Sequence, residues 1–272
     1  RLNLLIATYP KPFIPLMDGF VMGGGVGVSC HGSHRIVTEH ARIAMPECAI
    51  GFLPDVGGSW LLKRAPGQCG LYLGMTGARM DAADAIYAGF ADHHIGRGAL
   101  DDFVAALTDG ASPAVALKRF SKDAGESALA SHQSDIDAAF AAENPAAVEV
   151  ALDSASRESS FAAAMLKSLR RNSPCAMAAA WIVQTESHIE SLADALALEY
   201  RYSYRALQRD EFFEGVRAAV IDKDRNPQWQ PSTLAEVDLA EVRAWLAPLD
   251  GFELELDLTG RAKKEHAYET LR

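Results

Sequence analysis

Apolar residues in the first third of the chain occur in short runs that glycine, proline and polar residues interrupt. Runs of this length, bounded by turn residues, predict short buried strands. Strands are predicted at 13–17, 20–22, 35–38 and 41–45. Helices are predicted at 2–9, 28–34, 59–64 and 71–75. Short strands that alternate with helices in this way predict an α/β core.

The pattern changes near residue 100, where alanine-rich stretches carry apolar residues three and four positions apart, as at Leu166 and Leu169. This spacing predicts helices to about residue 245. Ser173 and Pro174 predict one helix start, with Ser173 as the N-cap and Pro174 at the first helical position. The expected regions are a core over 1–100, a helical region over 101–247 and a charged tail over 248–272.

Composition predicts a protein with a substantial core, because 49% of the 272 residues are hydrophobic. The formal net charge of −10 argues against nucleic acid or an anionic membrane as a partner, although a local basic patch remains compatible with it. No apolar run reaches the roughly 20 residues of a membrane span. The apolar start of the chain, Leu4-Leu5-Ile6, is too short for a signal peptide.

The four cysteines lack CxxC spacing and lack histidines at zinc-site intervals. Cys30 and His34 are four residues apart, but two ligands do not make a metal site. Free thiols in apolar surroundings behave as small hydrophobic side chains. We therefore expect reduced cysteines, no bound metal and a cytoplasmic location.

A glycine cluster, Gly23-Gly24-Gly25 with Gly27, follows a predicted strand. Glycines at a strand-to-helix junction allow backbone N–H groups to point at a ligand, where the helix dipole also favours negative charge. Such a turn can hold a phosphate, or the oxyanion that forms when a thioester carbonyl is attacked. Close packing of a helix against a strand explains the same glycines equally well.

Glu47 and Asp55 lie in short loops between apolar segments. A carboxylate near apolar walls has its pKa raised toward a range that suits acid–base or nucleophilic chemistry. Two such groups that face one pocket could divide the roles of nucleophile or base and of acid or orienting group. The structural alternative is that Asp55 caps the following helix and that Glu47 is exposed on a turn.

Other polar residues carry weaker signals. Ser29, His31 and His34 lack the G-x-S-x-G context of a hydrolase nucleophile, and their spacing fits an ordinary helix. Lys223 and Arg225 could contact phosphates, although a solvated charged turn explains them as well.

As an ordered set, these motifs resemble the crotonase (enoyl-CoA hydratase/isomerase) superfamily. The matching segments are 11–14, 18–19, 22–25, 45–47, 50–51, 53–58, 76–79 and 83–89. The resemblance implies a (ββα)n spiral core with a helical carboxyl-terminal region. It also implies that the N–H of Gly24 is an oxyanion-hole donor and that Gly23, Gly24, Glu47 and Asp55 contact the acyl-CoA substrate. Because the family's amino-terminal strands precede the first motif, we expect this chain to lack the amino-terminal part of the family fold.

Two positions indicate the subfamily. Hydratases of this family typically carry a second glutamate where this chain has Gly27, and a small residue where it has Asp55. Glycine at 27 with Glu47 and Asp55 resembles the 3-hydroxyisobutyryl-CoA hydrolases, as do segments 172–174, 198–201, 213–218 and 221–229.

The implied reaction is hydrolysis of a short β-hydroxyacyl-CoA thioester in valine degradation. Glu47 would act as nucleophile or base, the Gly24 N–H would stabilise the oxyanion, and Asp55 would orient the substrate hydroxyl or assist proton transfer. No cofactor is expected beyond the coenzyme A of the substrate, and a homo-oligomer is one option because family members often form trimers or hexamers. The alternatives are an enoyl-CoA hydratase or isomerase on the same fold and a non-catalytic acyl-CoA binder.

Overall fold

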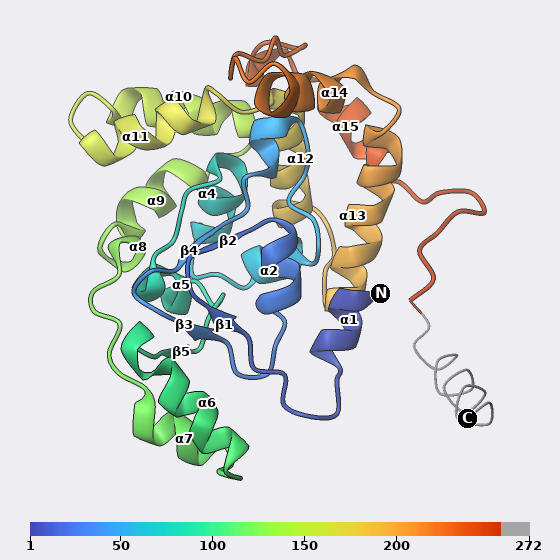
Figure 1. Ribbon diagram of the computed structural model, residues 1–272. Helices are drawn as coiled ribbons and strands as arrows, with labels where there is room; N and C mark the ends of the chain where they lie inside the picture. The colour runs from blue at the N-terminus through green and yellow to red at the C-terminus, as the bar shows by residue number, and fades with distance from the viewer. Residues whose placement is uncertain (257–272) are drawn as a thin grey trace.

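The strands of the described chain are short, and each pairs in parallel with a neighbour (Figure 1). The computed structural model describes residues 1–256. Its strands are β1 (Leu16–Met17), β2 (Phe20–Met22), β3 (Ile36–Val37), β4 (Arg42–Ala44) and β5 (His93–His94). Helices interleaved with them are α1 (Leu2–Ala7), α2 (Gly24–Ser29), the 3₁₀-helix η1 (Glu47–Ile50), α3 (Gly58–Lys63), α4 (Cys69–Thr76), α5 (Ala82–Tyr87) and the 3₁₀-helix η2 (Arg97–Ala99).

The strand order confirms the predicted spiral of strand–strand–helix units. One unit is β1, β2 and α2, and the next is β3, β4, η1 and α3. β3 pairs beside β1 in a sheet of order β1-β3-β5, and β4 pairs beside β2 in a second sheet. Corresponding strands of successive units therefore stack, which places the residues that follow β2 and β4 at the same end of their sheet.

After β5, every element of the described chain is helical. These elements are α6 (Leu100–Thr108), α7 (Pro113–Phe120), α8 (Ala128–Ser131), α9 (Gln133–Phe140), α10 (Pro145–Ala155), α11 (Ser160–Leu169), α12 (Pro174–Thr185), α13 (Leu192–Ala206), α14 (Asp210–Val216), the π-helix η3 (Arg217–Ile221), η4 (Leu234–Glu236) and α15 (Leu239–Trp245). Within residues 1–256 no helix has both the length and the apolar character to cross a membrane.

Local signals explain several helix starts. The Ser173 hydroxyl accepts a hydrogen bond from the Ala176 N–H, with Pro174 at the first helical position, as predicted for α12. Ser112 with Pro113 and Asn144 with Pro145 begin α7 and α10 in the same way.

Two predicted elements near the glycines have different bounds in the structure. The helix placed at 28–34 spans Gly24–Ser29 instead, because Gly23 leaves β2 with φ +50° and the helix begins one residue later. It ends before Gly32, where an added Cβ would lie 2.6 Å from the Pro15 ring. The strand placed at 13–17 is limited to β1, since Pro12 and Pro15 have no N–H for a ladder.

One large apolar core joins the two predicted regions. It extends from Met17 in β1 to Leu246 after α15, and α12 lies within it, between α4 and α15. A smaller cluster lies where β3 packs against α6 and α7. The division at residue 100 stays a prediction. Of the predicted tail at 248–272, residues 257–272 lie outside the described residues.

Candidate active site

The glycine turn after β2 leaves two backbone donors available. Gly23 adopts φ +50° and is the N-cap of α2, so that Gly24 and Gly25 occupy its first turn. The first N–H groups of a helix have no partner within the helix. The N–H groups of Gly24 and Gly25 have no acceptor among residues 1–256 either. They are therefore free to bind an anionic oxygen at the positive end of α2.

Glu47 lies directly against this turn. It is the first residue of η1, and its side chain is buried, with 7% of the residue exposed. A Cβ built on Gly23 would lie 2.8 Å from Oε1 of Glu47, so a side chain at this position, already disfavoured by φ +50°, would push the carboxylate from its place. The other oxygen, Oε2, has no hydrogen-bond partner among the described residues. The alternative of an exposed Glu47 on a turn is therefore wrong.

Burial changes the acidity of Glu47. The pKa of Glu47 is raised to about 8, mainly by burial and to a smaller extent by the negative charges of Asp55 and Glu199, while the residue's own backbone N–H acts in the opposite direction. None of the groups that shift this pKa is basic. A carboxyl group in this environment can hold a proton near neutral pH and can act as a strong base or nucleophile once it is ionised.

Asp55 lies in the loop between η1 and α3. It is partly buried, and this burial raises its pKa above the ordinary value. The next residue, Val56, has φ +52°, which is rare for a β-branched side chain. The Val56 carbonyl accepts a hydrogen bond from Nε2 of His31 at 2.8 Å, which helps to hold this strained conformation. Strain of this kind is commonly found beside functional residues.

Sequence reasoning missed the role of Glu199. This residue of α13 is only 2% exposed, and its carboxylate accepts hydrogen bonds from the N–H groups of Gly57 (2.7 Å) and Ser59 (3.0 Å). Glu199 therefore caps α3, and the alternative that Asp55 caps this helix is wrong. Burial raises the pKa of Glu199 to about 8, while the two N–H groups favour its ionised form.

A signal for Glu199 is present in the sequence. The buried positions of α13 recur at helical spacing, and Glu199 falls on this stripe with Leu192, Ala195, Leu196, Tyr202 and Ala206. An acidic residue on an apolar stripe must find partners when it is buried. The stripe indicates such partners, although it does not say that they lie in the loop after η1.

Gly27 serves packing. A Cβ at this position would lie 2.6 Å from Cβ of Val56 and 2.5 Å from Nδ2 of Asn3. A glutamate at position 27 would require both neighbours to move. The glycine cluster thus has two roles that the sequence left as alternatives: Gly23 and Gly24 shape the turn beside Glu47, and Gly27 admits the loop that carries Asp55.

Ser29, His31 and His34 do not come together as a second site among the described residues. The Nε2 of His31 donates to the Val56 carbonyl, and burial lowers the pKa of His31, which favours the neutral ring; this side chain therefore supports the loop. His34 accepts from or donates to the Ser33 hydroxyl at 2.9 Å, and Ser29 ends α2. Within residues 1–256, no three His, Cys, Asp or Glu side chains are placed to hold a metal ion.

Helices from the carboxyl-terminal half hold η1 in place. The N–H of Ser173 donates to the Cys48 carbonyl at 2.9 Å, and the Ser173 hydroxyl bonds the Glu211 carboxylate. Gly51 and Gly215 mark a close crossing of η1 and α14, because a Cβ on either would meet the other element's backbone. The position of Glu47 therefore depends on residues more than 120 positions away in the sequence.

The chain has clear similarity to known proteins. The family model described as enoyl-CoA hydratase/isomerase matches residues 1–246. A curated protein named 3-hydroxyisobutyryl-CoA hydrolase, mitochondrial, from Xenopus tropicalis is 36% identical over 266 residues, which cover 94% of this chain and 68% of the relative. The human protein of the same name is 35% identical over 265 residues, with 93% and 68% covered.

Two solved structures share the fold in detail. A carnitinyl-CoA dehydratase from Mycobacterium thermoresistibile superposes with a TM-score of 0.87 at 40% identity, covering 95% of this chain and 73% of that one. An enoyl-CoA hydratase from Rhodobacter sphaeroides superposes with a TM-score of 0.86 at 46% identity, covering 93% and 73%. The names of these relatives thus divide between hydrolysis of a thioester and addition or removal of water.

Proposed function

This chain belongs to the enoyl-CoA hydratase/isomerase family, and we propose that it hydrolyses the thioester of a short β-hydroxyacyl-CoA, with 3-hydroxyisobutyryl-CoA as the expected substrate. One observation carries the proposal: the buried Glu47 carboxylate lies against a glycine turn whose Gly24 N–H is free. The curated relatives named as hydrolases, similar over more than nine-tenths of this chain, support the same reaction.

Gly24 and Glu47 supply the two halves of the chemistry. The thioester carbonyl oxygen accepts a hydrogen bond from the Gly24 N–H, and this bond strengthens as negative charge develops on the oxygen. Ionised Glu47 then either attacks the carbonyl carbon or removes a proton from a water molecule that attacks it. In both cases the bond between carbon and sulfur breaks, and coenzyme A leaves as the thiol after protonation.

Asp55 acts on the substrate's hydroxyl group in this proposal. Asp55 is partly buried, and its raised pKa shows that water solvates its carboxylate poorly. A hydrogen bond to the substrate hydroxyl would replace some of that missing solvation. Gly23 admits the Glu47 side chain to the turn, and Glu199 is a positioning residue because it acts through the loop that carries Asp55.

The two routes for Glu47 differ in one measurable product. Direct attack forms a mixed anhydride between the acyl group and Glu47, and its hydrolysis by water returns the free carboxylate. A single turnover in ¹⁸O-labelled water then places label in the Glu47 side chain whenever water attacks the glutamyl carbon. The general-base route leaves Glu47 unlabelled, because the water oxygen goes only to the acyl product.

An enoyl-CoA hydratase on this fold is the second candidate, favoured by the names of the two solved structures. The packing around Gly27 argues against a hydratase. Hydration of a double bond in this family uses two glutamates, and Val56 and Asn3 fill the space that a side chain at position 27 would need. A non-catalytic acyl-CoA binder is the third candidate, and an unpartnered buried carboxylate would have no role in it.

Several finer features stay predictions. A single methyl group changes binding by only ~1–3 kcal/mol, so the site would also accept 3-hydroxypropionyl-CoA. Catalysis without a cofactor, a place in valine breakdown, a cytoplasmic location and assembly into a homo-oligomer are each expected from sequence. The word mitochondrial in the relatives' names describes those proteins.

The test compares two activities of the full-length protein. Thiol release from 3-hydroxyisobutyryl-CoA that disappears in Glu47→Gln supports the hydrolase. Loss of the conjugated absorbance of crotonyl-CoA without thiol release means that the protein is a hydratase. Tight binding of either thioester without turnover means that it is a binder.

A further inference from the structure

The loop from 53 to 59 carries Asp55 and contains a strained turn. Val56 has φ +52°, and it is one of three residues other than glycine with a positive φ in the described chain. This conformation is disfavoured for a β-branched side chain and persists only where surrounding contacts hold it. Gly57 follows with φ +79°, so the chain turns sharply directly after Asp55. The direction of the Asp55 side chain therefore depends on what holds this turn.

His31 holds the turn from the side of α2. It follows Cys30, the C-cap of this helix, and only 9% of the residue is exposed. Its Nε2–H donates to the Val56 carbonyl at 2.8 Å. A Cβ built on Gly57 would lie 2.6 Å from the same nitrogen, so the imidazole ring lies directly against the turn. His31 therefore fixes the backbone one and two residues after Asp55.

Glu199 holds the turn from the side of α13. Its buried carboxylate accepts hydrogen bonds from the N–H groups of Gly57 at 2.7 Å and of Ser59 at 3.0 Å, one for each oxygen. Leu192 of the same helix adds an apolar contact, because a Cβ on Gly57 would also meet its Cδ1 atom. The turn is thus clamped between the end of α2 and a helix from the distant carboxyl-terminal region.

Asp55 has no contact with another residue that would fix its direction. Among the described residues, its carboxylate is bonded only to its own backbone N–H. Its place is therefore set by the turn and by α2, which touches the loop through His31 and at Gly27. A Cβ added to Gly27 would lie 2.6 Å from Cβ of Val56. Because α2 also begins at Gly24, one helix sets the separation between the Gly24 N–H and Asp55.

We propose that His31 and Glu199 are positioning residues that make the site select acyl groups by the position of a hydroxyl group. This inference rests on the proposed function, in which the thioester carbonyl binds at Gly24 and the substrate hydroxyl binds at Asp55. With the separation fixed, a hydroxyl reaches Asp55 only from one position along the acyl chain. Without such a hydroxyl, the poorly solvated Asp55 gains no partner, and the transition state is bound less tightly.

The first experiment compares thiol release by the full-length protein from three coenzyme A thioesters. These are the 3-hydroxyisobutyryl thioester, its 2-hydroxyisobutyryl isomer and the isobutyryl thioester, which lacks the hydroxyl. In the native protein, kcat/KM for the first should be at least about 10² times that for either of the others, because a site built for a hydroxyl discriminates against its absence. We call the ratio of the first value to the third the hydroxyl preference. Equal kcat/KM values for the two hydroxylated isomers would overturn the proposal.

The His31 variants test the hydrogen bond to Val56. His31→Leu removes the donor and should lower the hydroxyl preference about fivefold, the effect expected from one neutral hydrogen bond. The fall should come from the hydroxylated thioester, while kcat/KM for isobutyryl-CoA stays nearly constant. His31→Gln keeps an N–H donor with a similar reach and should restore most of the preference. An equal fall in both variants would mean that the hydrogen bond does not fix the loop, and the proposal would be wrong.

The Glu199 variant tests the other side of the turn. Glu199→Gln replaces one carboxylate oxygen with an NH₂ group, which cannot accept from the N–H that it faces. The hydroxyl preference should fall at least about tenfold, because a buried donor then lacks its acceptor. Glu199 is buried, so this substitution also lowers stability. The His31 pair carries the test on its own if Glu199→Gln does not fold.

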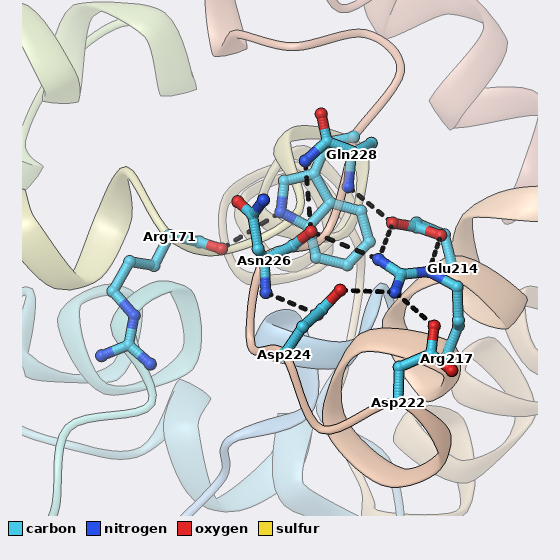
Figure 2. A network of polar contacts seen from close by, with 8 residues as sticks. Arg171, Glu214, Arg217, Asp222, Asp224, Asn226 and Gln228 are labelled. Atoms are coloured by element: carbon cyan, nitrogen blue, oxygen red, sulfur yellow. Dashed lines mark hydrogen bonds and ion pairs between the residues drawn. The ribbon is translucent and has the colours of Figure 1, made fainter.

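A second strained loop provides the matched control, and Figure 2 shows it from close by. The loop from 222 to 228 contains Lys223 and Arg225, the other two non-glycine residues of the described chain with a positive φ. The Arg217 guanidinium donates to two carboxylates of this loop at 2.7 Å and to the Asn226 carbonyl at 3.2 Å. This loop is therefore held as the Asp55 loop is, by side-chain bonds, but the partners of the guanidinium lie between residues 214 and 226.

Arg217→Met releases this second loop and should change kcat/KM for the hydroxylated and the plain thioester alike. The hydroxyl preference should stay within about twofold of the native value, because distant sites act independently. A fall equal to that in His31→Leu would show that any loosened loop lowers the preference, and the proposal would be overturned.

A binding measurement separates this inference from the proposed function. Coenzyme A thioethers that carry a 3-hydroxy-2-methylpropyl or a 2-methylpropyl group cannot be hydrolysed, and calorimetry gives their affinities. The hydroxylated thioether should bind more tightly to the native protein, and His31→Leu should reduce this difference about fivefold. If the native protein releases no thiol, this result rejects the hydrolase and supports the positioning role, whereas an unchanged difference rejects both. Thiol release with a hydroxyl preference that His31→Leu leaves unchanged supports the hydrolase and rejects the positioning role.

Discussion

Two clusters of three carboxylates in this molecule have opposite electrostatic surroundings. Glu47, Asp55 and Glu199 form the buried cluster, in which burial raises every pKa and no basic group contributes to the shifts. Glu214, Asp222 and Asp224 form the surface cluster, and all three pair with the Arg217 guanidinium. Arg217 and the Gln228 N–H lower the pKa of Glu214 to about 2.

The difference shows how environment assigns a role to the same residue types. A surface carboxylate with a cation beside it is stable as an anion and can only brace the loop that it joins. A buried carboxylate without a cation is destabilised as an anion, and a fold retains such a group where the reactivity is used. The buried cluster is therefore the place where chemistry is expected, and the surface cluster is a frame.

The largest expected effect comes from removing the ionisable group of the buried cluster. Glu47→Gln keeps the shape of the side chain and should lower thiol release by a factor on the order of 10²–10⁴, because the base or nucleophile is lost. Glu158→Gln is the matched control at an exposed position and should leave the rate unchanged. Full activity in Glu47→Gln would show that the buried cluster is not the catalytic one.

The next effect isolates the backbone donor. Gly24→Pro removes the N–H at the first position of α2, where proline fits a helix, and should lower kcat by about 10²–10³. Gly24→Ala keeps the N–H, and its Cβ would meet no heavy atom within 4 Å. Steady-state kinetics should therefore separate the two variants. Equal losses in both would point to a steric effect instead of a lost donor.

The pKa of Glu47 predicts a pH dependence. Because burial raises this pKa to about 8, the reactive anion is scarce at lower pH, and kcat/KM should rise about tenfold per pH unit up to that midpoint. Between the ordinary pKa of a glutamate and about pH 8, Glu47 holds a proton in the native state and has lost it in the unfolded state. The free energy of unfolding therefore falls as the pH rises through this window. The Tm of Glu47→Gln relative to the native protein should therefore increase toward pH 8. A constant difference would contradict the raised pKa.

A smaller effect tests the packing that supports the buried cluster. Gly27→Ala places a Cβ 2.6 Å from Val56, beside Asp55, and should lower the free energy of unfolding by about 1–3 kcal/mol. Gly98→Ala is the control, since its Cβ would meet no heavy atom within 4 Å. Urea unfolding of both variants measures the difference. A neutral Gly27→Ala would mean that the Asp55 loop moves freely, and a hydratase-type glutamate would then fit.

The smallest expected effect concerns the surface cluster. Arg217→Met removes the cation from three carboxylates and should lower Tm slightly, by less than Gly27→Ala does. The decrease should shrink at 1 M salt, where exposed charges are screened within about 3 Å. Above pH 8 the two substitutions should then change Tm in opposite directions. Glu47→Gln removes a destabilising negative charge from the buried cluster, whereas Arg217→Met removes a stabilising positive charge from the surface cluster.

Much of the candidate site follows from local patterns. A glycine run after an apolar segment predicted the turn, and acidic residues between apolar segments singled out Glu47 and Asp55. Ser173 and Pro174 predicted the start of α12. These features depend on a residue and its close neighbours in the chain, because backbone conformations and helix caps are local properties.

Tertiary structure decided what these residues do. The bond from Gly57 to Glu199 joins positions 142 apart, and the close crossing of Gly51 and Gly215 joins η1 to a distant helix. Only this packing buries Glu47 and leaves one of its oxygens without a partner. It also places Val56 so close to position 27 that a glycine is needed there. Sequence spacing specifies the elements, whereas burial and charge at a site arise when distant elements exclude water together.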